Sequence, residues 1–236
     1  MGSKKTMKMK AVILLSGGID SATCLALAIK EYGKDNVLTL CCRYGQKHEV
    51  ELTYAGMIAK HYGVKMVVFD LCSVYSTSTS SLIANSGIEV DKGTYSEVVS
   101  QSTSMISSCI PFRNGVMISA ANAIALSEYP DSNINIYIGS HQDDNCYPDC
   151  SESFIEAMDS AIFHGSGRVA RLISPFVSKT KAEIVALGIS LGIPHEMTYS
   201  CYNGRAEHCG TCPSCRTRQE AFDLNNKIDP VKYEAI

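Results

Sequence analysis

Six consecutive residues, Ser16-Gly17-Gly18-Ile19-Asp20-Ser21, combine glycines, hydroxyls and a carboxylate in an order that favours phosphate binding. The apolar run 11–15 precedes them and is typical of a buried parallel strand. Residues 22–30 follow with apolar positions at helical spacing. Glycine permits close backbone approach, and a helix N-terminus offers unpaired N–H groups with a partial positive charge. The stretch therefore predicts an anion site where the first strand ends.

This loop is not a Walker A motif, because no Gly-Lys-Ser/Thr follows the glycines. Ser-Gly-Gly-x-Asp-Ser instead resembles the PP-loop of ATP pyrophosphatases, which hold pyrophosphate and transfer AMP to an oxygen of the substrate. The alternative is an ordinary Gly-Gly turn, which the flanking strand and helix disfavour. The resemblance implies ATP contacts along the loop and the start of the helix, at Leu15, Ser16, Gly17, Gly18, Ile19, Asp20, Ser21, Ala22, Thr23, Cys24 and Leu25.

A second chemical pattern lies near the C-terminus, where Cys201, Cys209, Cys212 and Cys215 have the spacing C-x7-C-x2-C-x2-C. Four thiolates this close in sequence can surround Zn²⁺ tetrahedrally. An iron–sulfur cluster is the alternative, since thiolates bind both. A site closed by four cysteines has no open position, so we expect a structural zinc rather than a catalytic one.

Composition limits the function classes. The 236 residues suffice for one large α/β domain. A net charge of −3 gives no broad basic surface, so we expect no direct nucleic-acid partner. No apolar run approaches the roughly 18 residues of a membrane span. We therefore expect a protein that does not bind membranes. Eleven cysteines without an export signal favour reduced thiols, and hence a cytoplasmic protein.

The elements that must position these motifs alternate between strand and helix. Strands are expected at 11–15, 37–41, 65–71, 135–138 and 169–173. Helices are expected at 22–30, 49–62, 152–163 and 179–187, and residues 110–115 open a further helix. This succession predicts a Rossmann-like parallel sheet with right-handed crossovers, whose ligands bind beyond the carboxyl ends of the strands. The Ser/Thr-dense stretch 72–109 has weak periodicity, and we expect a surface excursion, partly mobile or a lid.

We expect three parts: an ATP-binding α/β domain at 10–200, a zinc-binding segment at 201–222 and a C-terminal tail at 223–236. Polar residues follow two of the predicted strands, namely Tyr44, Gln46, Asp144, Tyr147 and Asp149. Carboxylates at this edge could coordinate Mg²⁺ on ATP or accept hydrogen bonds from a guanine-like edge. A solvated acidic loop is the alternative.

Two cations stand where helices begin. The helix dipole disfavours Arg113 at such a position unless the guanidinium holds a phosphate or carboxylate. A structural arginine paired with a nearby acid is the alternative. Lys181, near the start of a later helix, could reach a phosphate, and the alternative is an exposed helical lysine.

Taken together, these segments resemble the QueC family of PP-loop ATP pyrophosphatases over residues 10 to 222. Phe112 and residues 142–145 depart from the family pattern, and 72–109 matches poorly. The matching motifs are the loop 16–21, Tyr44-Gly45-Gln46-Lys47-His48, Pro111-Phe112-Arg113-Asn114, Tyr147-Pro148-Asp149-Cys150, Lys181-Ala182-Glu183-Ile184 and Ser200-Cys201-Tyr202 with the three later cysteines.

The resemblance implies ATP-dependent conversion of 7-carboxy-7-deazaguanine and free ammonia to 7-cyano-7-deazaguanine (preQ0), through adenylated carboxylate and amide intermediates, in queuosine biosynthesis. It implies ATP with Mg²⁺, a structural Zn²⁺ and a homodimer. The catalytic residues it implies are Ser16, Asp20, Ser21, Arg113 and Lys181. The substrate-binding residues would be Tyr44, Gln46, Arg113, Asp144, Tyr147 and Asp149.

Three other functions stay open. A related PP-loop enzyme could adenylate another carboxylate or conjugate a deazapurine. A tRNA-thiolation enzyme would need a reactive pair of cysteines of low pKa near the loop; Cys24 or Cys109 could be nominated, but neither has a supporting motif. A non-catalytic zinc module that binds nucleic acid would need a basic face, which the charge balance does not supply.

Overall fold

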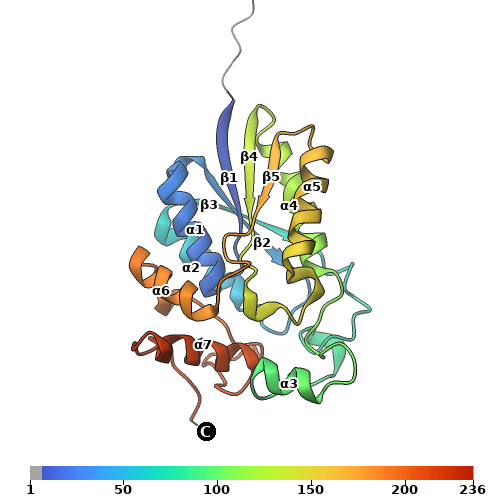
Figure 1. The fold of residues 1–236 in the computed structure, drawn as a ribbon, viewed down its shortest axis with the longest axis vertical. Helices are drawn as coiled ribbons and strands as arrows, with labels where there is room; N and C mark the ends of the chain where they lie inside the picture. The colour runs from blue at the N-terminus through green and yellow to red at the C-terminus, as the bar shows by residue number, and fades with distance from the viewer. Residues whose placement is uncertain (1–6, 236) are drawn as a thin grey trace, which may run out of the picture.

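Five parallel strands form the centre of the molecule in the computed structural model, which describes residues 7–235 (Figure 1). Their order in the sheet is β3-β2-β1-β4-β5. The chain therefore moves to one side of β1 for β2 and β3 and to the other side for β4 and β5. This makes β1 the point where the topology switches. The strands are β1 (Lys8–Leu14), β2 (Val37–Arg43), β3 (Lys65–Asp70), β4 (Ser132–Tyr137) and β5 (Ala170–Ile173).

Burial follows the position of each strand. Val12 in the middle of β1 is fully buried and pairs with Leu38 of β2 and Ile136 of β4. Such continuous apolar runs are typical of strands covered on both faces. At the edge of the sheet, β3 leaves Val68 about half exposed. The predicted parallel α/β sheet is confirmed, with each strand within three residues of its expected bounds at either end.

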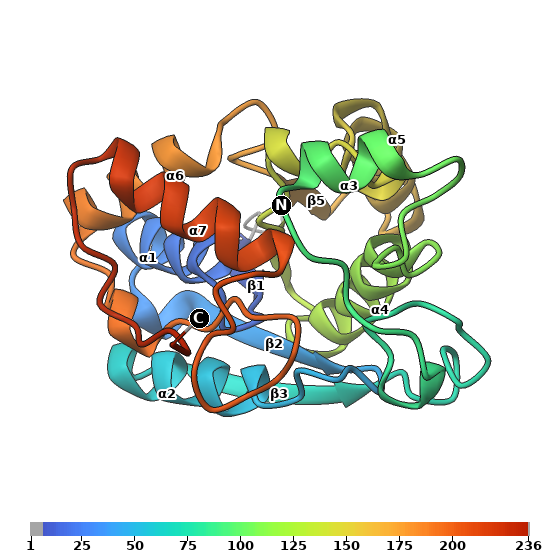
Figure 2. The same ribbon diagram turned by 90° about the horizontal axis from the view of Figure 1, so that it is seen from below.

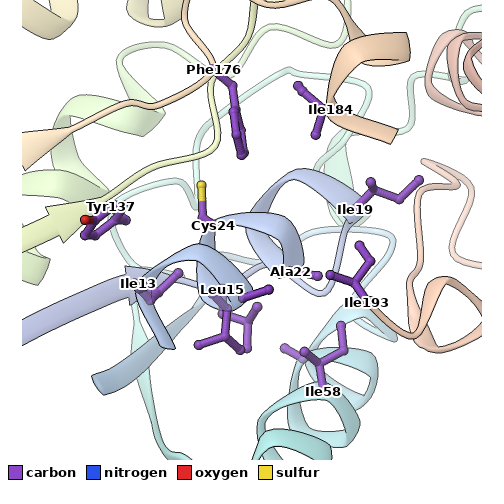
Figure 3. Close-up of a cluster of buried hydrophobic side chains, with 14 of the residues drawn as sticks. Ile13, Leu15, Ile19, Ala22, Cys24, Ile58, Tyr137, Phe176, Ile184 and Ile193 are labelled. Atoms are coloured by element: carbon purple, nitrogen blue, oxygen red, sulfur yellow. The ribbon is translucent and has the colours of Figure 1, made fainter. Parts of the chain in front are cut away.

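Helices cover both faces of the sheet (Figures 1 and 2). One face carries α1 (Ile19–Tyr32), α2 (Glu51–Tyr62) and α6 (Lys181–Leu191), and the other carries α4 (Arg113–Glu128) and α5 (Glu152–Gly165). Figure 3 shows the core of the first face, in which Ile13 and Leu15 lie near Ala22 of α1 and Ile58 of α2. This core lies directly beside the Gly-Gly loop and fixes its entry and exit.

Two further helices, α3 (Tyr95–Gln101) and α7 (Pro213–Leu224), lie at the carboxyl end of the sheet (Figure 2). Neither was predicted. The signal for α3 is a capping box in which Thr94 and Glu97 bond each other's backbone N–H groups. The signal for α7 is Pro213 at its first turn. Short 3₁₀ turns occupy Lys34–Asn36, Ala84–Ser86, Gln142–Asp144, Pro148–Cys150 and His195–Met197.

The stretch 72–109 is more than a surface excursion. Leu82 and Ile83 are buried against Tyr44 and Cys201, and Val98 packs in a separate small cluster with Tyr147. Its mobility and the three-part domain division stay predictions. No helix within residues 7–235 has the length and apolar character needed to cross a bilayer.

Candidate active site

The Gly-Gly loop is held by contacts that only glycine allows. Gly17 has a φ of 84°, and a Cβ atom there would lie 2.6 Å from the Glu51 carbonyl oxygen. The Gly17 carbonyl also accepts a hydrogen bond from the Tyr199 N–H at 2.9 Å. Gly139, just past β4, approaches from another side, where a Cβ would lie 3.0 Å from that of Asp20. Three distant segments therefore press on the loop and shape it.

Inside the loop, two hydroxyls organise the backbone. Ser16 N–H donates to Ser21 Oγ at 3.2 Å, and Ser21 Oγ donates to the Gly18 carbonyl at 3.1 Å. Gly18 is the N-cap of α1, and no side chain caps this helix end. The first-turn N–H groups of α1 are therefore available to an anion, as the sequence predicts.

Asp20 and Lys181 form an ion pair across the cavity. Lys181 Nζ lies 2.6 and 2.7 Å from the two Asp20 carboxylate oxygens. Thr180 and Glu183 form a capping box that starts α6 at Lys181, and the Lys181 N–H donates to Asp143 at 2.7 Å. Burial raises the pKa of Asp20, but the charges of Lys181 and His141 and the hydrogen bonds to the carboxylate together outweigh burial and hold the pKa below its usual value. Asp20 is thus an ionised carboxylate.

His141 joins this pair to a second acid. Its Nε2 lies 3.7 Å from Asp20 and 3.3 Å from Asp144. Burial raises the pKa of Asp144, although the charge of His141 opposes that change. His141 was not predicted as a site residue, even though it lies in the loop that follows β4, at the edge where ligands bind.

Arg113 lies in the cavity without an acidic partner. Among residues 7–235 it forms no ion pair, and its guanidinium carbon lies 5.8 Å from the centre of the Tyr44 ring. The nearby acid, Asp149, instead accepts the Asn114 N–H at 2.8 Å and so caps α4. Phe112 takes a left-handed φ of 54° where the chain turns into α4. The alternative of a structurally paired arginine is therefore not observed in this part of the chain.

A hydrogen-bonded group follows β2. Gln46 accepts the Tyr44 N–H at 2.8 Å and donates to Glu51 Oε1 at 2.8 Å. The other Glu51 oxygen lies 3.4 Å from His48 Nε2, which lies 3.3 Å from the Tyr44 hydroxyl. Gln46 is buried and fixes its neighbours from behind rather than lining the cavity.

The buried carboxyl group of Glu51 is expected to make the free energy of unfolding depend on pH. Burial raises its pKa from 4.5 to about 7. Between these values the unfolded chain ionises while the folded protein keeps the proton, so the free energy of unfolding falls as pH rises. The interval corresponds to about 3 kcal/mol. We expect Glu51→Gln to match the wild type near pH 4.5 and to be more stable by up to about 3 kcal/mol at pH 8, measured by urea unfolding.

The matched control for this comparison is Glu49→Gln. Glu49 lies two residues earlier and pairs with Arg43 at the surface, where both side chains are about half exposed. Its substitution is expected to leave the difference between the two pH values unchanged. Equal stability of wild type and Glu51→Gln at pH 8 would contradict a buried, weakly acidic Glu51.

Tyrosines from separate segments of the chain form another side of the cavity. The hydroxyls of Tyr95 and Tyr202 lie 2.6 Å apart, which joins the stretch 72–109 to the cysteine segment. The Tyr147 hydroxyl bonds Ser108 at 2.8 Å, and its ring meets that of Tyr95 edge-on. These rings give the cavity an aromatic wall beside its charged floor.

One cavity brings most of the predicted residues together. Those that line it are Leu15, Ser16, Gly18, Ile19, Asp20, Ser21, Tyr44, Arg113, Asp144, Tyr147 and Lys181. Those that do not line it are Gly17, Ala22, Thr23, Cys24, Leu25, Gln46 and Asp149. Lining residues that the sequence reasoning did not nominate include His48, Glu51, Tyr95, Asn114, His141, Tyr199, Ser200, Tyr202, Ser214 and Thr217. The individual roles of all these residues stay predictions.

The four cysteines meet as predicted, with their sulfur atoms within 4.8 Å of one another. A tetrahedral site with metal–sulfur bonds of about 2.3 Å places its sulfurs about 3.8 Å apart, so the cluster can hold a metal ion. The backbone N–H of Cys212 donates to Cys209 Sγ at 3.3 Å, as thiolate ligands require. Ser200 and Tyr202 flank Cys201, and Ser214 lies between Cys212 and Cys215, so the cysteine segment also forms part of the cavity wall.

Neither cysteine considered for thiolation is activated. Burial raises the pKa of Cys24 well above its usual value, and it also raises the pKa of Cys109. Both remain protonated thiols at neutral pH, which argues against their use as nucleophiles.

Comparisons with known proteins agree with this geometry. The family described as "Queuosine biosynthesis protein QueC" matches residues 10–226. A 7-cyano-7-deazaguanine synthase from Pseudoalteromonas atlantica is 35% identical over 97% of this chain and 100% of its own length. The Aquifex aeolicus 7-cyano-7-deazaguanine synthase is 40% identical over 89% of this chain and 95% of its own.

Among solved structures, NMN synthetase from Francisella tularensis is similar with a TM-score of 0.50 and 15% identity, over 94% of this chain and 79% of that one. This likeness concerns the fold alone, and it agrees with the predicted parallel α/β architecture. The family resemblance inferred from the motifs is confirmed by the match over 10–226 and by relatives that are similar along nearly their whole length. The chain therefore belongs to the QueC family of queuosine biosynthesis proteins.

Proposed function

We propose that this protein converts 7-carboxy-7-deazaguanine and ammonia to 7-cyano-7-deazaguanine with ATP. The observation that carries the proposal is one cavity that holds a phosphate-binding loop, the Asp20–Lys181 pair and Arg113, which forms no ion pair within residues 7–235. The relatives named 7-cyano-7-deazaguanine synthase, similar over nearly their full length, support the choice of substrate.

The chemistry explains why such a cavity is needed. A carboxylate is a poor electrophile because its leaving group would be oxide. Attack of the carboxylate oxygen on the α-phosphorus of ATP gives an acyl-adenylate and pyrophosphate, and AMP is a good leaving group. Ammonia then displaces AMP to form the amide. A second adenylation, on the amide oxygen, lets AMP leave again as the nitrile forms.

The residues of the chain act on charge and position. The first-turn N–H groups of α1 and the Ser16 and Ser21 hydroxyls would hold the departing pyrophosphate. Lys181 and Arg113 would neutralise the charge of phosphates and of the substrate carboxylate. Asp144 lines the cavity and is our candidate for reading the guanine-like edge, whereas Asp149 is occupied by α4. Tyr44 and Tyr147 would contact the ring.

Mg²⁺ fits the donor set of the cavity, because Asp20 presents an ionised carboxylate in the phosphate-binding loop. When bound with ATP, the ion would neutralise phosphate charge. We propose free ammonia as the nitrogen source, a homodimer as the assembly and the cytoplasm as the compartment. All eleven cysteines are unpaired, which suits a reducing compartment.

Product analysis tests the proposal. Mass spectrometry of a reaction with ATP, ammonium and 7-carboxy-7-deazaguanine is expected to show acid, amide and nitrile in succession, with AMP and pyrophosphate as by-products. ADP and orthophosphate as the only by-products would contradict it. AMP formation that depends on a different carboxylate, and not on this one, would favour a divergent enzyme of the same family.

We propose Zn²⁺ as the metal of the cysteine cluster, with Cys201, Cys209, Cys212 and Cys215 as ligands. Elemental analysis is expected to find one zinc per chain, and Cys201→Ser is expected to remove it. Iron with a visible charge-transfer absorption would indicate an iron–sulfur cluster instead.

Loss of the Thr211 hydroxyl is expected to weaken the binding of this metal. It donates to Cys209 Sγ at 3.6 Å, which stabilises the thiolate. Thr211→Val keeps the shape of the side chain but removes the donor. Because such outer contacts tune metal binding, zinc affinity is expected to fall about 10-fold, measured by competition with a chromophoric chelator.

The control is Thr217→Val on α7, whose hydroxyl donates to the Pro213 carbonyl and not to a sulfur. It should leave the zinc affinity unchanged. An unaltered affinity in Thr211→Val would show that the hydroxyl does not support the ligand.

A further inference from the structure

Formation of the amide needs a proton acceptor. Ammonia in neutral water is mainly ammonium, whose nitrogen has no lone pair to attack the adenylated carboxyl. One proton must therefore leave before the C–N bond forms. A carboxylate suits this role, because it attracts the ammonium cation and accepts its proton.

The acidic residues around the cavity differ in whether their carboxylate already has a partner or an assigned role. Both oxygens of Asp20 bond Lys181. Asp144 is the group that we assign to the guanine-like edge of the substrate, and Asp149 caps α4 from outside the cavity. Glu51 remains. One of its oxygens accepts a single hydrogen bond from Gln46, and the other lies 3.4 Å from the nearest ring nitrogen, so lone pairs are left for a further donor.

Glu51 also stands in the right place. It is the first residue of α2, and its carbonyl oxygen lies so close to the phosphate-binding loop that a Cβ on Gly17 would come within 2.6 Å of it. Its side chain is 13% exposed and lines the same cavity as Ser16 and Arg113. A cation bound there would lie in the same cavity as the phosphate-binding loop, where we place the nucleotide.

We infer that the Glu51 carboxylate binds ammonium in this cavity and accepts the proton that ammonium loses before attacking the acyl-adenylate. Gln46 and His48 hold the carboxylate in position. The inference rests on the proposed function and adds a catalytic residue to it.

The step balances as follows. Ammonium gives one proton to Glu51, and the lone pair left on nitrogen forms the C–N bond to the acyl carbon. The bond from that carbon to the AMP oxygen breaks, and AMP leaves with the electron pair. The nitrogen then carries one proton more than an amide, and this proton passes to water. Glu51 returns its own proton to solvent before the next turnover.

The electrostatic setting agrees with this role. Burial raises the pKa of Glu51 to about 7, against the opposing effects of the Gln46 hydrogen bond and the Arg113 charge. A base works best when its pKa lies near the working pH. The titratable or charged groups around Glu51 are Cys41 and Cys42 of β2, Tyr44 and His48 of the following loop and Arg113 of α4.

The test compares two nucleophiles in single-turnover reactions at pH 7. Glu51→Gln preserves shape and a hydrogen-bond partner for Gln46 but cannot accept a proton. With ammonium, the rate of amide formation is expected to fall about 100-fold, whereas adenylation measured without ammonium falls far less. Hydroxylamine, which is neutral at pH 7, needs no initial deprotonation, so its rate is expected to stay within about 3-fold of wild type.

Two further variants sharpen the result. Glu49→Gln, on the surface, is the matched control and should match the wild type with both nucleophiles. Glu51→Asp keeps a carboxylate, so it should recover part of the rate with ammonium, and it provides the comparison if Glu51→Gln does not fold. Equal losses with ammonium and hydroxylamine would overturn the inference alone. If the wild type forms no adenylate from 7-carboxy-7-deazaguanine, the proposed function fails as well.

Discussion

Replacing Lys181 with methionine is expected to slow pyrophosphate release from ATP about 1,000-fold in the presence of 7-carboxy-7-deazaguanine. The Lys181 ammonium is nearly buried and bonds both oxygens of Asp20. Its loss removes a cation from the reacting phosphates and also leaves Asp20 unpaired beside them. Because both effects oppose the build-up of negative charge, they add to the barrier for adenylation rather than to substrate binding alone. The kinetic constant to measure is kcat for pyrophosphate release.

Lys179→Met provides the control. Lys179 lies two residues earlier, it does not line the cavity, and within the described part of the chain only its backbone makes hydrogen bonds. It should retain wild-type activity. Since Asp20 and Lys181 act as a unit, the double variant Asp20→Asn/Lys181→Met should be no slower than the worse single variant. A kcat for Lys181→Met within 3-fold of wild type would exclude the proposed role of the ion pair.

Replacing Arg218 with methionine is expected to lower the free energy of unfolding by about 3–5 kcal/mol. Arg218 on α7 is fully buried and forms two hydrogen bonds with Asp229, at 2.7 and 2.9 Å. It also donates to Thr198, Ser200 and the carbonyl of His195. Methionine fills similar space but leaves a buried carboxylate and several acceptors without partners. Urea unfolding of the metal-loaded protein measures the loss.

A surface pair gives the comparison. Lys65 and Glu128 lie 2.8 Å apart, but the lysine is 60% exposed. Lys65→Met should cost no more than about 1 kcal/mol, because water already screens such pairs. Similar costs for the two substitutions would mean that the Arg218 network contributes no more than a surface contact.

Local patterns in the sequence predicted much of the site. The glycine spacing and the flanking strand located the phosphate-binding loop, since a strand end followed by a helix start is defined by neighbouring residues. The same logic placed Tyr44 and Asp144 at the carboxyl edge, because all parallel strands end there. The cysteine spacing predicted a cluster that the fold does bring together.

Partnerships between distant residues could not be predicted in this way. Asp20 and Lys181 are 161 positions apart, and only the packing of α6 against α1 brings them into contact. The helix α7 escaped prediction because Arg218 interrupts the apolar residues of its buried face, such as Ala221 and Phe222. Tyr95 escaped because it lies in a Ser/Thr-dense stretch, although Thr94 and Glu97 signal the start of its helix.

The walls of the cavity come from segments far apart in the sequence, from Leu14 to Thr217. During translation, the phosphate-binding loop is synthesised well before Tyr199 to Thr217. A nascent chain that holds the loop but not yet the later segment lacks part of the wall around the reacting groups. Nucleotide consumption is therefore expected only after the later segment has folded against the loop.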